Sequence, residues 1–157
     1  MLTKTLEEPR ISFQEFPKGF YATMANTEKY LKECGIPHAL IELIKIRTSQ
    51  INHCGYCLDM HHKDALKAGE TFDRLYLLPA WEESPCYTPA EKAALFLTEV
   101  LTQISHHDAA TIEKAYHVME DHYSKEEIAN VVLAICQINS WNRIAITFGN
   151  VPGSYKG

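Results

Sequence analysis

Two cysteines and a histidine stand close together in the segment Cys54-Gly-Tyr-Cys57-Leu-Asp-Met-His61. Spacings of three and four residues bring side chains onto one face of an α-helix, so the two thiols and the imidazole are expected to meet. Two adjacent thiols can exchange between a dithiol and a disulfide, and a nearby imidazole can take up a thiol proton. The residue types and their spacing therefore predict a redox-active pair, Cys54 and Cys57, assisted by His61.

A zinc site and an inert buried pair of cysteines are the alternatives for this segment. A closed zinc site needs four ligands, and no second CxxC or HxxxH follows to complete the three that the segment offers. Cysteines at the start of a helix lie in its positive dipole field, which stabilises a thiolate. The spacing thus favours a redox dithiol and leaves the two alternatives open.

Glu42 interrupts an apolar run, residues 39–44, in the helix expected before the motif. Spacing alone favours a simple reason for this charge, either an ion pair with Lys45 or exposure to solvent. The functional interpretation is that the next helix packs back, so that Glu42 meets His61 and Cys54. Glu42 would then accept a proton, with a pKa raised by burial.

Helical periodicity recurs along the chain, and no clean strand-type alternation lies between turn residues, so the chain is predicted to be all-α. Glycines at 35 and 69 suit helix ends, and the capping boxes Thr88-Pro-Ala-Glu91 and Ser124-Lys-Glu-Glu127 suit helix starts. The expected fold is an extended arm to about residue 17, then six to seven helices with the CxxC motif at the start of a central one. The expected helices cover residues 20–33, 37–51, 54–68, 72–78, 89–104, 108–121 and 124–148.

Length and charge narrow the class of protein. The 157 residues suit one domain, spanning 1–157. The net charge is -5 and no block of Lys or Arg occurs, so no nucleic-acid partner is expected. Residues 1–14 contain no apolar targeting core, and the longest apolar run, 131–136, is too short to span a bilayer. We expect a soluble cytoplasmic protein with no membrane partner.

Five cysteines are an odd number without the spacing of a disulfide framework, which fits a reducing compartment. None of the other three cysteines has a second cysteine within a few residues, so we interpret them as inert packing residues. They are Cys34, Cys86 and Cys136.

The last expected helix carries apolar residues over more than half of its circumference, and one small chain offers few neighbours to cover them. We therefore expect a homo-oligomer in which this helix lies at the interface. The apolar residues concerned are Val131, Val132, Ile135, Ile138, Ile144 and Phe148.

The segment from Glu42 to Gly69 resembles the core of the carboxymuconolactone decarboxylase superfamily, in its alkylhydroperoxidase D-like (AhpD-like) branch. The match includes a glutamate twelve residues before the first cysteine, the CxxC pair, a histidine four residues after it, and the later Ala65 and Gly69. Residues 137–143 resemble the last helix of the same branch more loosely.

The resemblance implies an all-α fold that assembles into trimers or hexamers, and a thiol peroxidase that reduces hydroperoxides without a metal or organic cofactor. In the family scheme the second cysteine attacks the peroxide and the first resolves the sulfenic acid as a disulfide. Carried over, Cys57 is peroxidatic, Cys54 resolving, and Glu42 and His61 relay protons. A small dithiol or a protein thiol restores the dithiol form.

One residue of the motif differs from the family pattern in a way that affects peroxide turnover. The founding peroxidases carry a histidine immediately before the second cysteine, where this chain has Tyr56 and so lacks a second imidazole. His53, before the motif, is not assumed to replace it. The true decarboxylases of the superfamily lack the cysteine pair, which argues against lactone decarboxylation. A general disulfide reductase, or a non-catalytic redox sensor or binding module, remains the alternative function.

Overall fold

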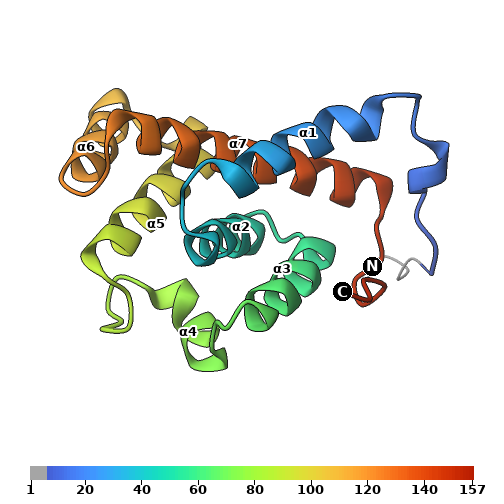
Figure 1. Ribbon diagram of the computed structural model, residues 1–157, viewed down its shortest axis with the longest axis horizontal. Coiled ribbons are helices and arrows are strands. Elements are labelled where there is room, and N and C mark those ends of the chain that lie inside the picture. The colour runs from blue at the N-terminus through green and yellow to red at the C-terminus, as the bar shows by residue number, and fades with distance from the viewer. Residues whose placement is uncertain (1–6) are drawn as a thin grey trace.

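The computed structural model describes residues 7–157, whose regular secondary structure is entirely helical (Figure 1). The all-α prediction is confirmed, and each predicted helix lies within two residues of the observed bounds. The prediction about residues 1–14 falls partly on residues 1–6, outside the described residues. The helices are α1 (Phe20–Glu33), α2 (His38–Ile51), α3 (Gly55–Lys67), α4 (Phe72–Leu77), α5 (Pro89–Thr102), α6 (Ala109–Glu120) and α7 (Lys125–Phe148), with 3-10 turns at Phe13–Glu15, Leu78–Ala80 and Ile104–His106.

Side-chain caps begin the helices where the sequence predicted them. Thr88 and Ser124 each accept a hydrogen bond from the backbone three residues on, and Glu91 and Glu127 bond back to complete both capping boxes. Asp108 caps α6 in the same way through the backbone N–H of Thr111. These local bonds satisfy backbone donors that no helix can satisfy at its own start, and so they fix where the helices begin.

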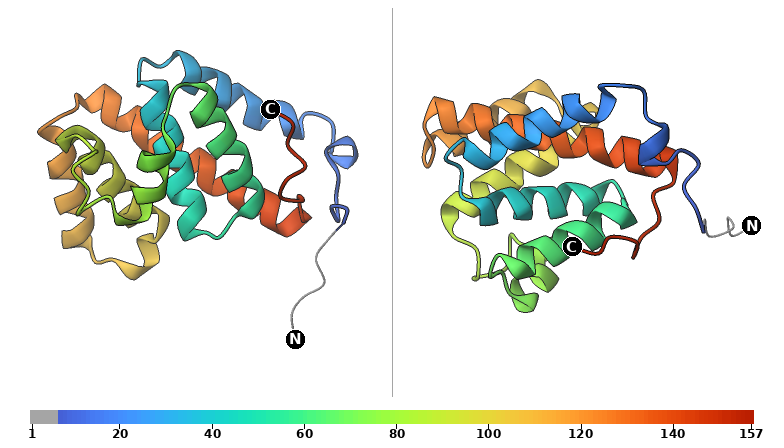
Figure 2. Two further views of the ribbon diagram at one scale, coloured as in Figure 1. Left: turned by 90° about the horizontal axis from the view of Figure 1, so that it is seen from below. Right: turned by 45° about the vertical axis from the view of Figure 1, so that its right-hand side comes forward.

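Helix α2 lies at the centre of the fold and packs against α3, α5 and α7 (Figures 1 and 2). Its two apolar sides serve two cores. Ile41 and Ile44 join the core formed with α5, α6 and α7, whereas Leu43 and Ile46 join a second core around Trp81. A helix covered on several sides must be apolar nearly all round, which makes its buried charges the exceptions that need an explanation.

Helix α7 is covered more fully by its own chain than the sequence suggested. Val131, Ile135 and Ile138 are at most 1% exposed because α1, α2, α3 and α5 pack over them. The large apolar side chains that α7 leaves exposed are Leu133 and Ile146. The residues chosen from sequence to mark a subunit interface are therefore in part core residues.

By length and hydropathy alone, α7 is long and apolar enough to span a membrane. The sequence prediction considered only the uninterrupted apolar run 131–136 and therefore did not identify this helix. Core helices pass the same test, and 39% of the most apolar window of α7 is buried within this chain, Ile135 and Ile138 among the buried residues.

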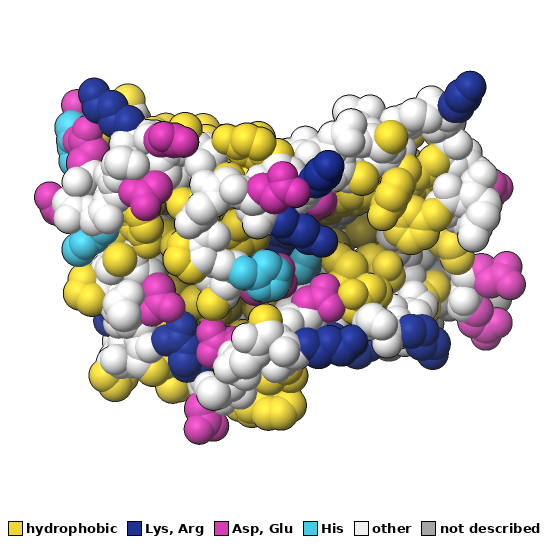
Figure 3. All heavy atoms as spheres, in the orientation of Figure 1, with side chains coloured by type: hydrophobic (Ala, Val, Ile, Leu, Met, Phe, Trp, Pro, Cys, Tyr) yellow, Lys and Arg dark blue, Asp and Glu magenta, His cyan; other side chains and the backbone are white. Residues whose placement is uncertain are grey.

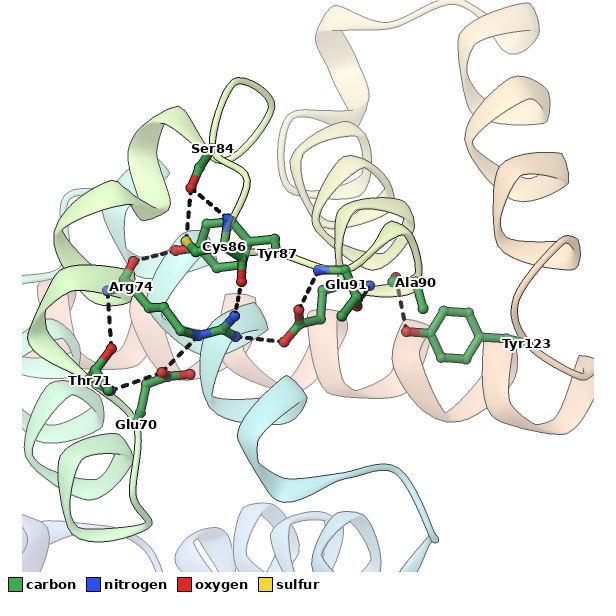
Figure 4. A network of polar contacts seen from close by, with 10 residues as sticks. Glu70, Thr71, Arg74, Ser84, Cys86, Tyr87, Ala90, Glu91 and Tyr123 are labelled. Atoms are coloured by element: carbon green, nitrogen blue, oxygen red, sulfur yellow. Dashed lines mark hydrogen bonds and ion pairs between the residues drawn. The ribbon is translucent and has the colours of Figure 1, made fainter.

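Arg74 joins three segments on the side of the fold occupied by α4 (Figure 4). Its guanidinium bonds Glu70 Oε1 (2.9 Å), Glu91 Oε1 (2.6 Å) and the backbone carbonyl of Cys86. It also stacks over the Tyr87 ring, whose hydroxyl donates to the Arg74 carbonyl. This network fixes α4 and the Pro-rich loop against the start of α5.

The C-terminal residues after α7 return across α3. Tyr155 donates through its hydroxyl to Asp64 Oδ1 (2.9 Å) and accepts at its carbonyl from Lys63 Nζ (3.0 Å). Pro152 lies over Gly55, where a side-chain carbon at position 55 would come within 2.9 Å of the proline ring. The tail therefore adds a layer over the helix that carries the CxxC motif.

Candidate active site at the start of helix α3

A tight turn between α2 and α3 positions the first cysteine. His53 adopts a left-handed conformation (φ 55°) and is exposed, and the backbone N–H of Cys54 donates to the Ser49 carbonyl (3.0 Å). Cys54 then becomes the N-cap of α3, and Cys57 lies one turn inside it. The backbone of His53 thus forms part of the turn that places Cys54, and its side chain is exposed.

Both thiols of the motif are buried, each at 1% exposure, between α3 and the α7 residues Ile138 and Ala145. Cys54 Sγ lies 2.7 Å from Cys57 Sγ, close enough for one thiol to hydrogen-bond to the sulfur of the other. The two sulfurs are therefore placed to exchange a proton in the dithiol form and to form a disulfide after a small rotation.

The two thiols differ in acidity. The Cys57 thiol hydrogen bond lowers the pKa of Cys54, helped by the backbone N–H groups at the start of α3 and by the Asn142 amide, and together these outweigh the opposing effect of burial. The hydrogen bond to Cys54, burial and the negative charge on Cys54 raise the pKa of Cys57. In the resting dithiol form the thiolate is thus favoured on Cys54.

Asn142 of α7 is fully buried beside the thiols and is fixed by two hydrogen bonds. Its oxygen accepts from Asn52 Nδ2 (3.0 Å), and its nitrogen donates to Ser49 Oγ (3.0 Å). Because the oxygen is held by Asn52, the remaining amide N–H is available to the sulfurs. Sequence reasoning missed this residue as part of the site, although an asparagine inside an apolar helix was a signal available to it.

Glu42 and His61 form a buried pair between α2 and α3. His61 Nδ1 lies 2.9 Å from Glu42 Oε2, and both residues are at most 5% exposed. The simple interpretation from sequence is wrong, since Glu42 is neither exposed nor paired with Lys45, whose ammonium binds Glu28 (2.7 Å) instead. The structure brings Glu42 to His61, which is one half of the functional interpretation; the Cys54 side chain bonds Cys57, and no hydrogen bond joins it to Glu42 among the described residues.

The expectation that burial raises the pKa of Glu42 is also wrong. Desolvation does act in that direction, but the His61 hydrogen bond and the positive charges of His61, Lys45 and His38 outweigh it, so the pKa of Glu42 lies below its usual value. Glu42 is therefore a carboxylate at neutral pH, and it orients His61 through Nδ1 and leaves Nε2 for proton exchange.

A cavity of about 1230 Å³, open to solvent, lies between α1, α2, α3 and the end of α7. Figure 3 shows this hollow on the face where α1 and α3 are in front, with hydrophobic atoms along much of its wall. Cys57, His61 and Glu42 line the cavity, whereas Cys54 is not among its lining residues. A small molecule in the cavity would therefore meet Cys57 rather than Cys54.

Tyr56 also lines the cavity, in the position where the founding peroxidases have histidine. Burial and the neighbouring Cys57 raise the pKa of its hydroxyl, so at neutral pH it stays protonated and can donate a hydrogen bond but cannot shuttle protons as an imidazole does.

Within residues 7–157, no three side chains of His, Cys, Asp or Glu are grouped as metal ligands, so Cys54, Cys57 and His61 do not make the zinc cluster considered from sequence.

Comparison with known proteins places these features in a family. The sequence model of the carboxymuconolactone decarboxylase family matches residues 17–100. Uncharacterized protein YdfG of Bacillus subtilis (strain 168) is 46% identical over 145 residues, which cover 92% of this chain and 97% of YdfG.

Two solved structures share the helical arrangement. ATU0492 of Agrobacterium tumefaciens, a protein of unknown function for which a role as the antioxidant defence protein AhpD has been suggested, superposes with a TM-score of 0.85 at 35% identity, covering 94% of this chain and 100% of that one. The debrominase Bmp8, in complex with 2,3,4-tribromopyrrole, has a TM-score of 0.75 at 18% identity and covers 85% of this chain and 70% of that one. The predicted AhpD-like helical fold is confirmed.

Proposed function

The chain belongs to the carboxymuconolactone decarboxylase family, and from this premise we propose that it is a thiol-dependent peroxidase of the AhpD-like branch, with an antioxidant role. The observation that carries the proposal is the pair of buried thiols, 2.7 Å apart, of which Cys57 lines a cavity that is also lined by the His61–Glu42 pair. One place thus combines a dithiol, a proton donor and room for a substrate.

Attack on the peroxide begins at Cys57, because Cys57 lines the cavity and Cys54 does not. The Cys57 proton passes to the Cys54 thiolate 2.7 Å away, and the new Cys57 thiolate attacks the terminal oxygen of a hydroperoxide. An S–O bond forms and the O–O bond breaks, giving a sulfenic acid on Cys57 and an alcohol as leaving group. His61 supplies the proton that the leaving oxygen needs, and Glu42 stabilises the charged imidazole.

Resolution uses Cys54. Cys54, which took up the Cys57 proton, passes that proton to His61, which is neutral after protonating the alcohol; the lowered pKa of Cys54 favours this transfer. The Cys54 thiolate then attacks the sulfenic sulfur, so that the S–S bond forms, the S–O bond breaks, and the leaving hydroxide takes the proton from His61 to become water. The sum is one hydroperoxide and two thiols converted to one alcohol, one water and one disulfide. An external dithiol then returns both cysteines to the reduced form.

Turnover of peroxide tests the function directly. With excess dithiothreitol or dihydrolipoamide, the wild type is expected to consume many equivalents of cumene hydroperoxide, and Cys57→Ser to reduce the rate at least about 100-fold because the nucleophile is lost. Cys136→Ser is the matched control, since Cys136 is exposed on α7 and does not line the cavity. Consumption limited to one equivalent would identify a redox sensor instead.

The order of attack needs a separate experiment, because the lowered pKa of Cys54 favours the reverse order and the cavity favours attack by Cys57. After one equivalent of peroxide, dimedone labelling is expected to trap a sulfenic acid on Cys57 in Cys54→Ser. A dimedone adduct on Cys54 in Cys57→Ser, formed at the wild-type rate of peroxide loss, would reverse the two roles.

A further inference from the structure

The cavity wall formed by α3 changes along its length from a thiol to charged side chains. Cys57, His61, Asp64 and Lys67 follow one another at helical spacing, and each lines the cavity. Ten residues separate Cys57 from Lys67, which corresponds to about 15 Å along the helix axis. This wall therefore begins at a thiol and ends at an ammonium group.

The opposite wall, formed by α1, changes in the same direction. Tyr21 lies at the start of α1, where its ring contacts Trp141 (6.2 Å between centroids). Trp141 packs against the apolar cluster that contains the two cysteines. Lys32 lies in the last turn of α1 and also lines the cavity. The aromatic end of α1 is thus close to the thiols, and its lysine end is distant from them.

The two lysine ends lie at the same end of the cavity. Helices α2 and α3 are joined by the short turn at residues 52–54 and meet again at the Glu42–His61 contact, so they run antiparallel. The end of α3, with Lys67, therefore lies towards the start of α2 at His38, which directly follows the end of α1. Figure 3 shows Lys and Arg atoms above and below the hollow.

Acidic groups along the cavity already have partners within the chain. Glu28 binds Lys45 and Trp141 Nε1, Glu42 binds His61, and Asp64 accepts from Tyr155. Lys29, Lys32 and Lys67 are exposed and form no ion pair with another residue in 7–157, although Lys67 lies against Gly157 at the chain end. The lining has four lysines and three carboxylates, so on a chain of net charge -5 the cavity keeps a small local excess of positive charge.

We propose that the cavity takes an elongated amphipathic substrate with a carboxylate about 15 Å from its reactive group, that is, a fatty acid hydroperoxide. The carboxylate meets Lys32 and Lys67, and the chain lies along Tyr21, Met60 and Trp141 with its peroxide at Cys57. A volume of about 1230 Å³ exceeds that of most drug-sized pockets and accommodates such a chain. The peroxide part rests on the proposed function, whereas the carboxylate part does not. The products are the hydroxy fatty acid, water and the disulfide.

Binding without turnover tests the carboxylate part by itself. Calorimetry on the wild type, with dodecanoate and dodecanol below their aggregation limits, is expected to show dodecanoate bound about fivefold more tightly at low salt. The difference should fall as salt is added and disappear in Lys32→Gln/Lys67→Gln. Lys125→Gln, at the exposed start of α7, removes the same type of charge outside the cavity and should retain it. Equal affinities in the wild type, or a difference that survives in the double variant, would overturn the proposal.

Kinetics then separates the two proposals. The kcat/KM for linoleic acid hydroperoxide is expected to exceed that for its methyl ester about fivefold, with the ratio near one in the double variant. Equal rates for acid and ester in the wild type would refute carboxylate recognition and leave the peroxidase intact. Absence of turnover with any hydroperoxide would refute the peroxidase, and the binding experiment would still decide whether the lysines recognise a carboxylate.

Discussion

Asn142 shows how a single side chain can prepare a thiol for reaction. Its amide faces the sulfurs because Asn52 holds its oxygen and Ser49 accepts from its nitrogen, and both partners come from the end of α2. An amide in that position stabilises a thiolate without adding charge to a buried site. The same hydrogen bonds also join α2 to α7.

Asn142→Ala is therefore expected to change both acidity and stability. The pKa of Cys54 should rise, because one of the groups that lower it is gone, and the pH profile of iodoacetamide alkylation should move to higher pH. Unfolding by urea should show a loss of about 2–4 kcal/mol, since Asn52 and Ser49 lose buried partners. Ser140→Ala, an exposed change on the same helix, is the control. An unchanged alkylation profile would exclude an electrostatic role for the amide.

Individual residues of the site differed in how far sequence could predict them. Cys54, Cys57 and His61 are neighbours along one helix, so local spacing suffices to place them on one face. Glu42 needed the packing of a second helix, and spacing alone gave the wrong partner. Asn142 and Glu28 lie far along the chain from the residues they bond. Asn142 bonds Asn52 across 90 positions, and Glu28 bonds Trp141 across 113. No local rule of helix spacing predicts contacts over such separations.

At the level of helices, local signals were sufficient for the ends but not for the contacts. Capping boxes and glycines act within a few residues, so the sequence predicted the ends of the helices within two residues. The Arg74 network is different, because it connects α4 to a loop and to α5 over as many as 17 positions. Nothing in the spacing of Glu70, Arg74 and Glu91 specified that they share one cluster.

Arg74→Met should lower the free energy of unfolding by about 2–3 kcal/mol at pH 7, because it removes charged hydrogen bonds to Glu70 and Glu91 from a partly buried site. Burial tends to raise the pKa of Glu91, but its bonds to Arg74 and Thr88 outweigh burial and hold the pKa below the usual value for a glutamate.

The pH dependence of that difference follows from the direction of the shift. Stability from Glu91 is complete above the unfolded pKa and is lost as pH falls through the lower folded pKa. The difference between the wild type and Arg74→Met should thus begin to shrink in chemical denaturation as pH falls below the usual glutamate pKa of about 4.3, without vanishing, because the Arg74 bond to the Cys86 carbonyl and its stacking on Tyr87 do not titrate. Lys18→Met, an exposed change, should match the wild type throughout. A constant difference down to pH 3 would contradict this account.

At the scale of the molecule, assembly remains a prediction from the resemblance and from the apolar character of α7. A substitution that tests assembly belongs at Leu133, which is exposed, because Ile135 is buried by the chain's own helices. We propose that a trimer or hexamer forms through the exposed side of α7.

Leu133→Glu is expected to lower the mass measured by light scattering and to leave helicity by circular dichroism unchanged. Ile135→Glu should instead unfold the subunit, with a loss of at least about 4 kcal/mol, because it buries an unpaired charge. Lys114→Glu, at an exposed position of α6, controls for the added carboxylate. A wild-type monomer at micromolar concentration, or a Leu133→Glu protein of unchanged mass, would remove the proposed interface.

The contact between Pro152 and Gly55 has a consequence for how this sequence can vary. Because the proline ring leaves no room for a side-chain carbon at position 55, one of the two residues between the cysteines is determined by the far end of the chain. A library randomised at position 55 and selected for folded protein should return glycine alone. The same library built on Pro152→Gly should also return alanine and serine. Positions 55 and 152 would then be expected to vary together in sequence, although nearly a hundred residues separate them.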